Sequence, residues 1–119
     1  METTENVLTT ESILTTGSVL PQDPLGLKRF ALTESAYDLV TSIKGVYGRL
    51  SHAESQRVNP DRALIDNWRN QSRKIGRTYQ RLDADDLMAI GEFIDVATTE
   101  WCQITKLENE RTSPPSHVS

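Results

Sequence analysis

The sequence predicts an all-α fold, either an antiparallel three-helix bundle or an extended helical hairpin with a third helix. In three successive stretches, apolar residues recur every three or four positions, which is the spacing of one face of an α-helix. Only short links separate these stretches, and helices joined by short links pack as antiparallel neighbours. No stretch reads as a central strand of a β-sheet. The three stretches lie within residues 33–111, which we interpret as one helical domain.

Residues 1–32 differ from the helical domain and are predicted to form a leader. They are rich in Thr and Ser and contain turn signals such as Asp23-Pro24. A six-residue repeat, ENVLTT followed by ESILTT and GSVL, begins at Glu5. Six is even, so an extended chain would place Val7, Ile13 and Val19 on one side and Leu8, Leu14 and Leu20 on the other. Two interpretations stay open: a flexible leader, or a segment (residues 5–20) that docks on a protein partner.

The first helix is predicted over residues 34–56, with Thr33 as its N-cap. Its apolar residues step by four and three positions and define one buried face. Gly45 and Gly48 lie off this face, and close packing of another chain is one hypothesis for them. The predicted core residues of this helix are Ala36, Leu39, Val40, Ile43, Val46, Tyr47 and Leu50.

The second helix is predicted to begin at Asn59-Pro60 and to end near Leu82. Asn is a preferred N-cap, and Pro suits the first helical turn because an N–H is not needed there. The predicted inner face contains Leu64, Trp68, Gln71, Ile75, Tyr79 and Leu82.

The third helix is predicted to follow Asp83 as N-cap, with Asp85 and Asp86 favoured by the positive N-terminal end of the helix. It should end near Arg111, and residues 112–119 are predicted to be a disordered tail. Its predicted inner face contains Leu87, Ile90, Ile94, Ala97, Trp101 and Ile104.

Positive charge is concentrated in the second predicted helix. The chain has a net charge of −4, yet residues 59–82 carry +4 and residues 83–119 carry −6. Four arginines follow one another at intervals of four residues, and residues at this interval are neighbours on a helix. They should therefore form one ridge of like charge that faces away from the core. The predicted binding residues, called here the basic ridge, are Arg62, Arg69, Arg73, Lys74, Arg77 and Arg81.

The basic ridge has three possible roles. A charged outer face can simply be solvated. Arginines also suit bidentate contacts with phosphates, and a ridge about 28 Å long can follow several nucleotides. Gly76, beside the arginines, would leave room for a phosphate backbone or another helix. Alternatively, the ridge could meet an acidic protein surface. The third predicted helix offers one in a second copy of the chain, through Asp85, Glu92, Asp95 and Glu110.

The sequence contains no recognisable constellation for catalysis, a cofactor or a metal ion, so no enzyme is predicted. His52 is expected on the surface near a helix end, and His117 belongs to the tail. Cys102 is the single cysteine, so an internal disulfide is excluded. We expect its thiol to be partly buried beside Trp101.

The sequence therefore favours a non-catalytic helical accessory subunit that binds an anionic partner. The favoured partner is the backbone of a nucleic acid, RNA or DNA, within a larger assembly. The alternative is a protein-only adaptor or regulator that self-associates as a homo-oligomer through its basic and acidic helix faces. The sequence contains no run of about 20 apolar residues, so no membrane span is predicted. The acidic N-terminus argues against a secretory signal, so a cytoplasmic location is expected.

Overall fold

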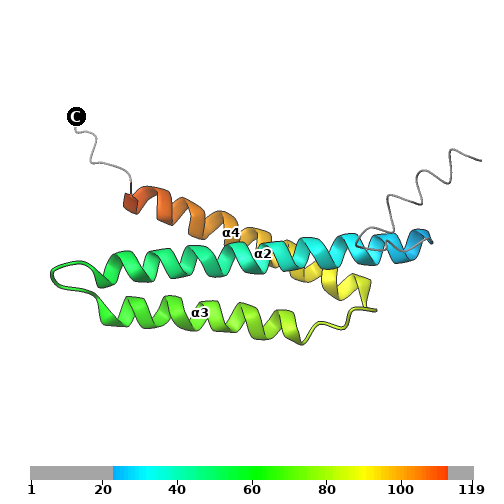
Figure 1. Cartoon of the computed structure of the whole chain (residues 1–119), viewed down its shortest axis with the longest axis horizontal. Coiled ribbons are helices and arrows are strands. Elements are labelled where there is room, and N and C mark those ends of the chain that lie inside the picture. The colour runs from blue at the N-terminus through cyan, green and yellow to red at the C-terminus, as the bar shows by residue number, and fades with distance from the viewer. Residues whose placement is uncertain (1–22, 113–119) are drawn as a thin grey trace, which may run out of the picture. The chain divides into compact units, whose positions relative to one another are not determined.

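The computed structural model describes residues 23–112 of the chain, and this part contains three α-helices and no β-strand. The helices are α2 (Pro24–Ser55), α3 (Arg62–Gln80) and α4 (Leu87–Thr112) (Figure 1). The predicted all-α class is confirmed. The proposed docking segment, residues 5–20, and tail residues 113–119 lie outside the described residues. The chain divides into two compact units, residues 1–31 and 32–119, and the packing described below concerns the second.

Helix α2 begins at Pro24, so the predicted start at residue 34 is wrong. The carboxylate of Asp23 accepts a hydrogen bond from the backbone N–H of Gly26 at 2.7 Å, as an N-cap does. Pro24 then occupies the first helical position, where its fixed φ is favourable. The Asp23-Pro24 pair therefore starts a helix instead of a turn. Thr33 lies within α2, and residues 24–32, assigned above to the leader, are helical.

Helix α3 is capped by Asp61, two residues after the predicted N-cap Asn59. Asp61 has extended backbone angles, and its carboxylate accepts a hydrogen bond from the N–H of Leu64 at 3.1 Å. Asn59 therefore lies in the link before the helix, and Asp61 is the residue that starts it.

Helix α4 is capped by Asp86 rather than by the predicted Asp83. The Asp86 carboxylate accepts a hydrogen bond from the N–H of Ala89 at 3.0 Å. Asp83 instead stabilises the preceding turn, because its carboxylate accepts a hydrogen bond from the N–H of Asp85 at 2.9 Å. The helix ends at Thr112, one residue after the predicted end.

Helices α2 and α3 contact each other in opposite order along the chain. The rings of Tyr37 and Tyr79 have centroids 6.3 Å apart, and the Lys44 ammonium donates a hydrogen bond to the Ser72 carbonyl at 3.0 Å. Moving forward along α2 therefore means moving backward along α3. Figure 1 shows the two helices side by side, running in opposite directions.

Helix α4 contacts α2 in the same order along both helices. The Tyr47 hydroxyl donates a hydrogen bond to the Glu100 carboxylate at 2.5 Å, and the Arg49 side chain donates to Glu108 at 2.7 Å. Helix α4 also contacts α3, since the rings of Tyr79 and Phe93 have centroids 6.2 Å apart.

Apolar residues from all three helices form one core. The sequence missed Ile65 and Phe93, which are 1% and 7% exposed. At 100° per residue both lie just outside the helical faces predicted from their neighbours, so the three-and-four step passes over them. The buried apolar residues of this core are Ala36, Val40, Ile43, Val46, Tyr47, Leu50, Ile65, Trp68, Ile75, Ile90, Phe93, Ala97 and Ile104.

Candidate nucleic-acid interface

The six residues of the basic ridge are all exposed. Helix α3 buries Ile65, Trp68 and Ile75 against the core. At 100° per residue, Arg73, Arg77 and Arg81 fall on the opposite side of the helix, and Arg62 and Arg69 fall on its flank. The same pattern that builds the core therefore presents the basic side chains to solvent.

The basic ridge is not neutralised by the described part of the chain. None of its six side chains forms a salt bridge with a carboxylate of residues 23–112. Arg73 donates a hydrogen bond to the neutral side-chain oxygen of Asn70. Asp66 is exposed one turn after Arg62 and lowers the charge of this helix face by one without forming a salt bridge within residues 23–112.

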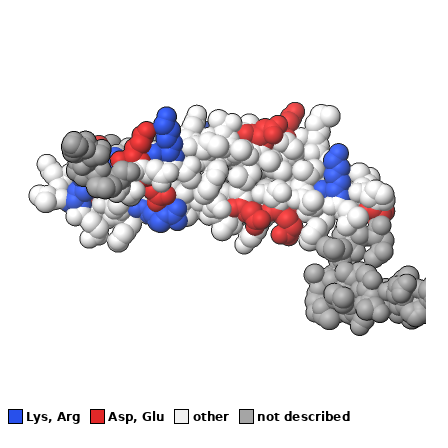
Figure 2. All heavy atoms as spheres, turned by 90° about the horizontal axis from the view of Figure 1, so that it is seen from above, with Lys and Arg blue, Asp and Glu red and all other residues white. Residues whose placement is uncertain are grey.

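Three other arginines have carboxylate partners. Arg49 lies 2.7 Å from Glu108, and Arg57 lies 3.2 Å from Glu54. Arg111 also binds Glu54. In the view of Figure 2, acidic and basic groups lie interspersed, and some touch each other. Other arginines among the described residues thus have carboxylate partners, whereas those of the ridge have none there.

Glu54 holds the start of α3 in place. Its side chain is only 3% exposed, and it accepts hydrogen bonds from the backbone N–H of Asp61 at 2.9 Å and from Arg57 and Arg111. The bond from the Asp61 N–H, followed by the two guanidinium groups, lowers the pKa of Glu54 despite its burial. The Arg111 guanidinium also lies 5.1 Å from the ring centroid of Trp68. The end of α2, the end of α4 and the first turns of α3 are thus fixed together.

Lys44 is a basic residue beside the ridge that sequence reasoning missed. It belongs to α2, but its ammonium donates to the Ser72 carbonyl on α3. A side chain added at Gly76 would meet this ammonium at 3.1 Å. The space predicted for a phosphate backbone or another helix is therefore occupied by Lys44. The only signal in the sequence was a glycine in the middle of a helix.

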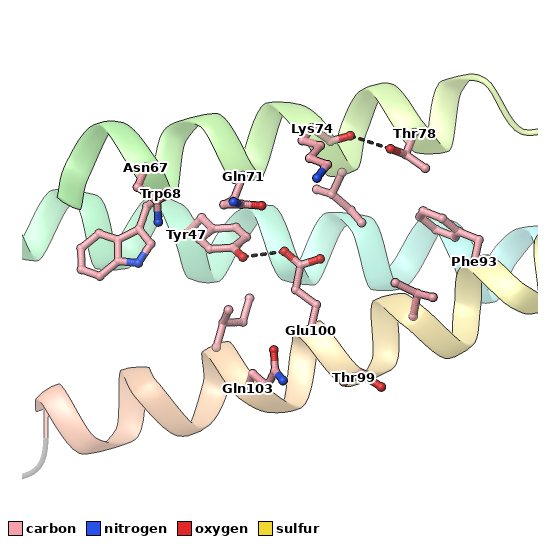
Figure 3. Close-up of a pocket in the computed structure, with 13 residues that line it drawn as sticks. Tyr47, Asn67, Trp68, Gln71, Lys74, Thr78, Phe93, Thr99, Glu100 and Gln103 are labelled. Carbon is pink, nitrogen blue, oxygen red and sulfur yellow. Dashed lines mark hydrogen bonds between the residues drawn. The ribbon is translucent and has the colours of Figure 1, made fainter. Parts of the chain in front are cut away.

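Lys74 lies at the edge of the ridge, where α3 faces α4 across a groove of about 660 Å³. Figure 3 shows Lys74 and Gln71 on one side of the groove and Glu100 and Gln103 on the other. Burial of Tyr47, followed by its hydrogen bond to Glu100, raises the pKa of the Tyr47 hydroxyl. The carboxylate of Glu100 makes this groove less suited to a polyanion than the outer face of α3.

The predicted acidic residues are exposed to solvent. Glu92, Asp95 and Glu110 lie on α4, and Asp85 lies in the link before it. Cys102 is also exposed, so the expectation of a partly buried thiol is wrong. Trp101 covers the core from the neighbouring position and leaves the thiol on the outside of the helix.

Comparisons with protein-family models, curated proteins and solved structures found nothing similar to this chain. Within residues 23–112, no helix combines the length and apolar character needed to cross a bilayer. In the same range, no three His, Cys, Asp or Glu side chains are grouped so that they could hold a metal ion. The function is therefore inferred from the chemistry of the ridge.

Proposed function

We propose that this chain is a non-catalytic helical accessory subunit that binds the sugar-phosphate backbone of a nucleic acid within a larger cytoplasmic assembly. One observation carries this proposal. Arg49, Arg57 and Arg111 have carboxylate partners, whereas the six ridge residues are exposed and have none within residues 23–112. Guanidinium groups in this state suit bidentate contacts with phosphate oxygens.

The arginines of the ridge repel one another until an anion binds. Each like-charge pair at this spacing costs about 0.2–0.5 kcal/mol, and Arg69, Arg73, Arg77 and Arg81 form three successive pairs. A polyanion lying along the helix removes this repulsion. From Arg62 to Arg81 the ridge is about 28 Å long, so one strand can contact several of its side chains.

We expect the protein to contact the sugar-phosphate backbone of the nucleic acid rather than its bases. Exposed Asn67, Asn70 and Gln80 add hydrogen-bond donors near the ridge. Trp68 and Tyr47 are buried in the core and offer no stacking platform. Affinity should therefore depend on phosphate contacts, with little preference for sequence.

The variant R69S/R73S/R77S tests the proposal. Binding of a fluorescent mixed-sequence RNA or DNA, measured by anisotropy, should be lost, because three phosphate contacts disappear. Circular dichroism should stay helical, since none of the three side chains belongs to the core.

A matched control removes three positive charges elsewhere. Lys28, Arg29 and Lys106 are exposed and lie outside the ridge, so K28S/R29S/K106S has the same net charge as the ridge variant. This control should bind almost as well as the wild type. Equal losses in both variants would show that only net charge matters, and full binding by the ridge variant would refute the proposal.

A protein-only adaptor is the second candidate, favoured by the acidic surface of α4. Glu92, Asp95 and Glu110 are exposed and form no salt bridge with residues 23–112. The ridge of one copy could bind this surface of another. In that case sedimentation of nuclease-treated protein should show an oligomer that R69S/R73S/R77S dissociates. A 260/280 nm absorbance ratio that falls on nuclease treatment would instead support the nucleic-acid proposal.

A further inference from the structure

A small pocket lies between α2 and α3, directly beside the basic ridge. Its volume is about 340 Å³. Two ridge residues, Arg69 and Arg73, line it, whereas Arg77 and Arg81 do not. Its lining contains no carboxylate. Apart from Tyr47, whose hydroxyl donates to Glu100, the polar side chains around it are Ser51, His52, Ser55, Arg69, Ser72 and Arg73.

Ser51 is a lining residue of this pocket and carries a buried polar atom without a partner. The residue is 5% exposed, and its hydroxyl oxygen has no hydrogen-bond partner. Buried polar atoms in folded proteins nearly always have a partner, so an exception needs a reason. A ligand atom in the pocket would provide the missing partner.

The side chains around the pocket are suited to an anion. Each guanidinium carries five N–H donors. Arg73 donates one hydrogen bond to Asn70, and its remaining N–H groups can still bind an anion. The Ser51 hydroxyl is free to donate. The Ser55 hydroxyl already donates to the His52 carbonyl at 2.6 Å. Because the charged side chains in the lining are both arginines, a cation is disfavoured and a compact oxyanion is favoured.

Gly48 leaves one wall of the pocket open. A Cβ atom built at this position meets nothing within 4 Å. The sequence suggested close packing of another chain as a reason for this glycine. The pocket offers a different reason, since an added side chain would occupy the space beside Ser51 and the arginines.

We infer that this pocket binds a single phosphate group through Arg69, Arg73 and Ser51. That this group belongs to the nucleic-acid strand on the ridge rests on the proposed function. The pocket then sets the position of the strand, because one phosphate is held between two helices while the following phosphates contact Arg77 and Arg81. Inorganic phosphate is the simplest ligand with the required chemistry.

The test compares inorganic phosphate with a strand on the full chain. In two-dimensional NMR titrations, phosphate should shift the amide signals of Ser51 and Gly48 saturably. The variant S51A should weaken phosphate binding by about tenfold, which is typical of losing one hydrogen bond to a charged group. G48M should abolish phosphate binding by filling the pocket, and methionine is a better helix former than glycine.

Two arginine pairs separate the pocket from the ridge. R69S/R73S should lose phosphate binding and weaken strand binding. R77S/R81S, which removes the same charge from the ridge outside the pocket, should weaken strand binding but keep phosphate binding. Thermal melts of all variants check the fold. If G48M proves unstable, R69S/R73S replaces it as the test, because it removes the charged side chains without filling the pocket.

The two proposals can fail separately. Absent or non-saturable phosphate binding by the wild type overturns the pocket, as does equal phosphate binding by the wild type, S51A and R69S/R73S. Saturable phosphate binding without any strand binding supports the pocket and refutes the proposed function. Strand binding that R77S/R81S weakens, without any phosphate binding, supports the ridge and refutes the pocket.

Discussion

Glu54 shows how a single residue joins all three helices. A buried carboxylate is costly to desolvate and is tolerated when it has charged or hydrogen-bonding partners. Glu54 has three: the N–H of Asp61, Arg57 and Arg111. Glu108 similarly joins two helices, because its carboxylate accepts a hydrogen bond from Arg49 on α2. This bond lowers the pKa of the Glu108 carboxyl group.

The stability of the fold should decrease in acid because of these two carboxylates. Their pKa values in the folded protein lie below the ordinary 4.5, so the unfolded chain binds protons at a higher pH than the folded chain does. Their contribution to the free energy of unfolding is complete above about pH 4.5. It should be lost as the pH falls through the folded pKa values. Thermal melts between pH 7 and pH 3 measure this loss.

The variant E54Q assigns the effect to Glu54. At pH 7 it should melt several degrees below the wild type, because Arg57 and Arg111 lose their charged partner, and the difference should shrink toward pH 3. The control E92Q, at an exposed position, should melt like the wild type. Equal melting temperatures of E54Q and the wild type at pH 7 would contradict the role given to Glu54.

At the scale of elements, each helix starts at an aspartate that accepts a hydrogen bond from an N–H three residues later. These residues are Asp23, Asp61 and Asp86. The sequence pattern placed the second and third starts within a few residues, but it missed the first. Asp-Pro is both a turn signal and a helix-start signal, and local sequence alone does not decide between them.

Replacing the cap of α3 should destabilise the fold. D61A removes the acceptor for the Leu64 N–H, and loss of an N-cap costs about 0.5–2 kcal/mol. The control N59A changes the residue that sequence reasoning chose, and it should cost much less. Urea unfolding measures both, and a larger loss in N59A than in D61A would contradict the assigned cap.

The sequence predicted the exposure of the ridge arginines, but it did not predict which residues of α2 lie beside them. Exposure of the arginines follows from helical period alone, which needs no knowledge of neighbouring helices. The positions of Lys44 and Ser51 depend on how α2 packs against α3, and periodicity within one helix contains no such information. Gly48 and Gly76 were visible as unusual residues, yet only the packing shows that one lies at a pocket and the other beside an ammonium group.

At the scale of the whole molecule, a net charge of −4 coexists with a surface suited to polyanions. Most of the chain should repel a nucleic acid, and the ridge should attract it. Binding is therefore expected in one orientation, with α3 toward the strand and the acidic surface of α4 away from the contact.

Salt should weaken strand binding in proportion to the number of phosphates engaged. Five or six contacts predict a slope of log affinity against log salt concentration of about −3.5 to −4 for a single strand. R69S/R73S/R77S should reduce the magnitude of this slope by about 2, if residual binding is measurable at low salt. A slope near zero for the wild type would show that phosphates are not the ligands of the ridge.

The ridge side chains are not part of the core and form no salt bridges among residues 23–112, so the residues needed for folding and those proposed for recognition occupy different positions of the same helix. A charge-reversed chain carrying glutamate at the ridge should consequently accumulate in cells to the same level as the natural one. Any phenotype of such a strain would report on what this surface recognises rather than on protein abundance. Such a strain would thus separate the effect of losing the binding surface from the effect of losing the protein.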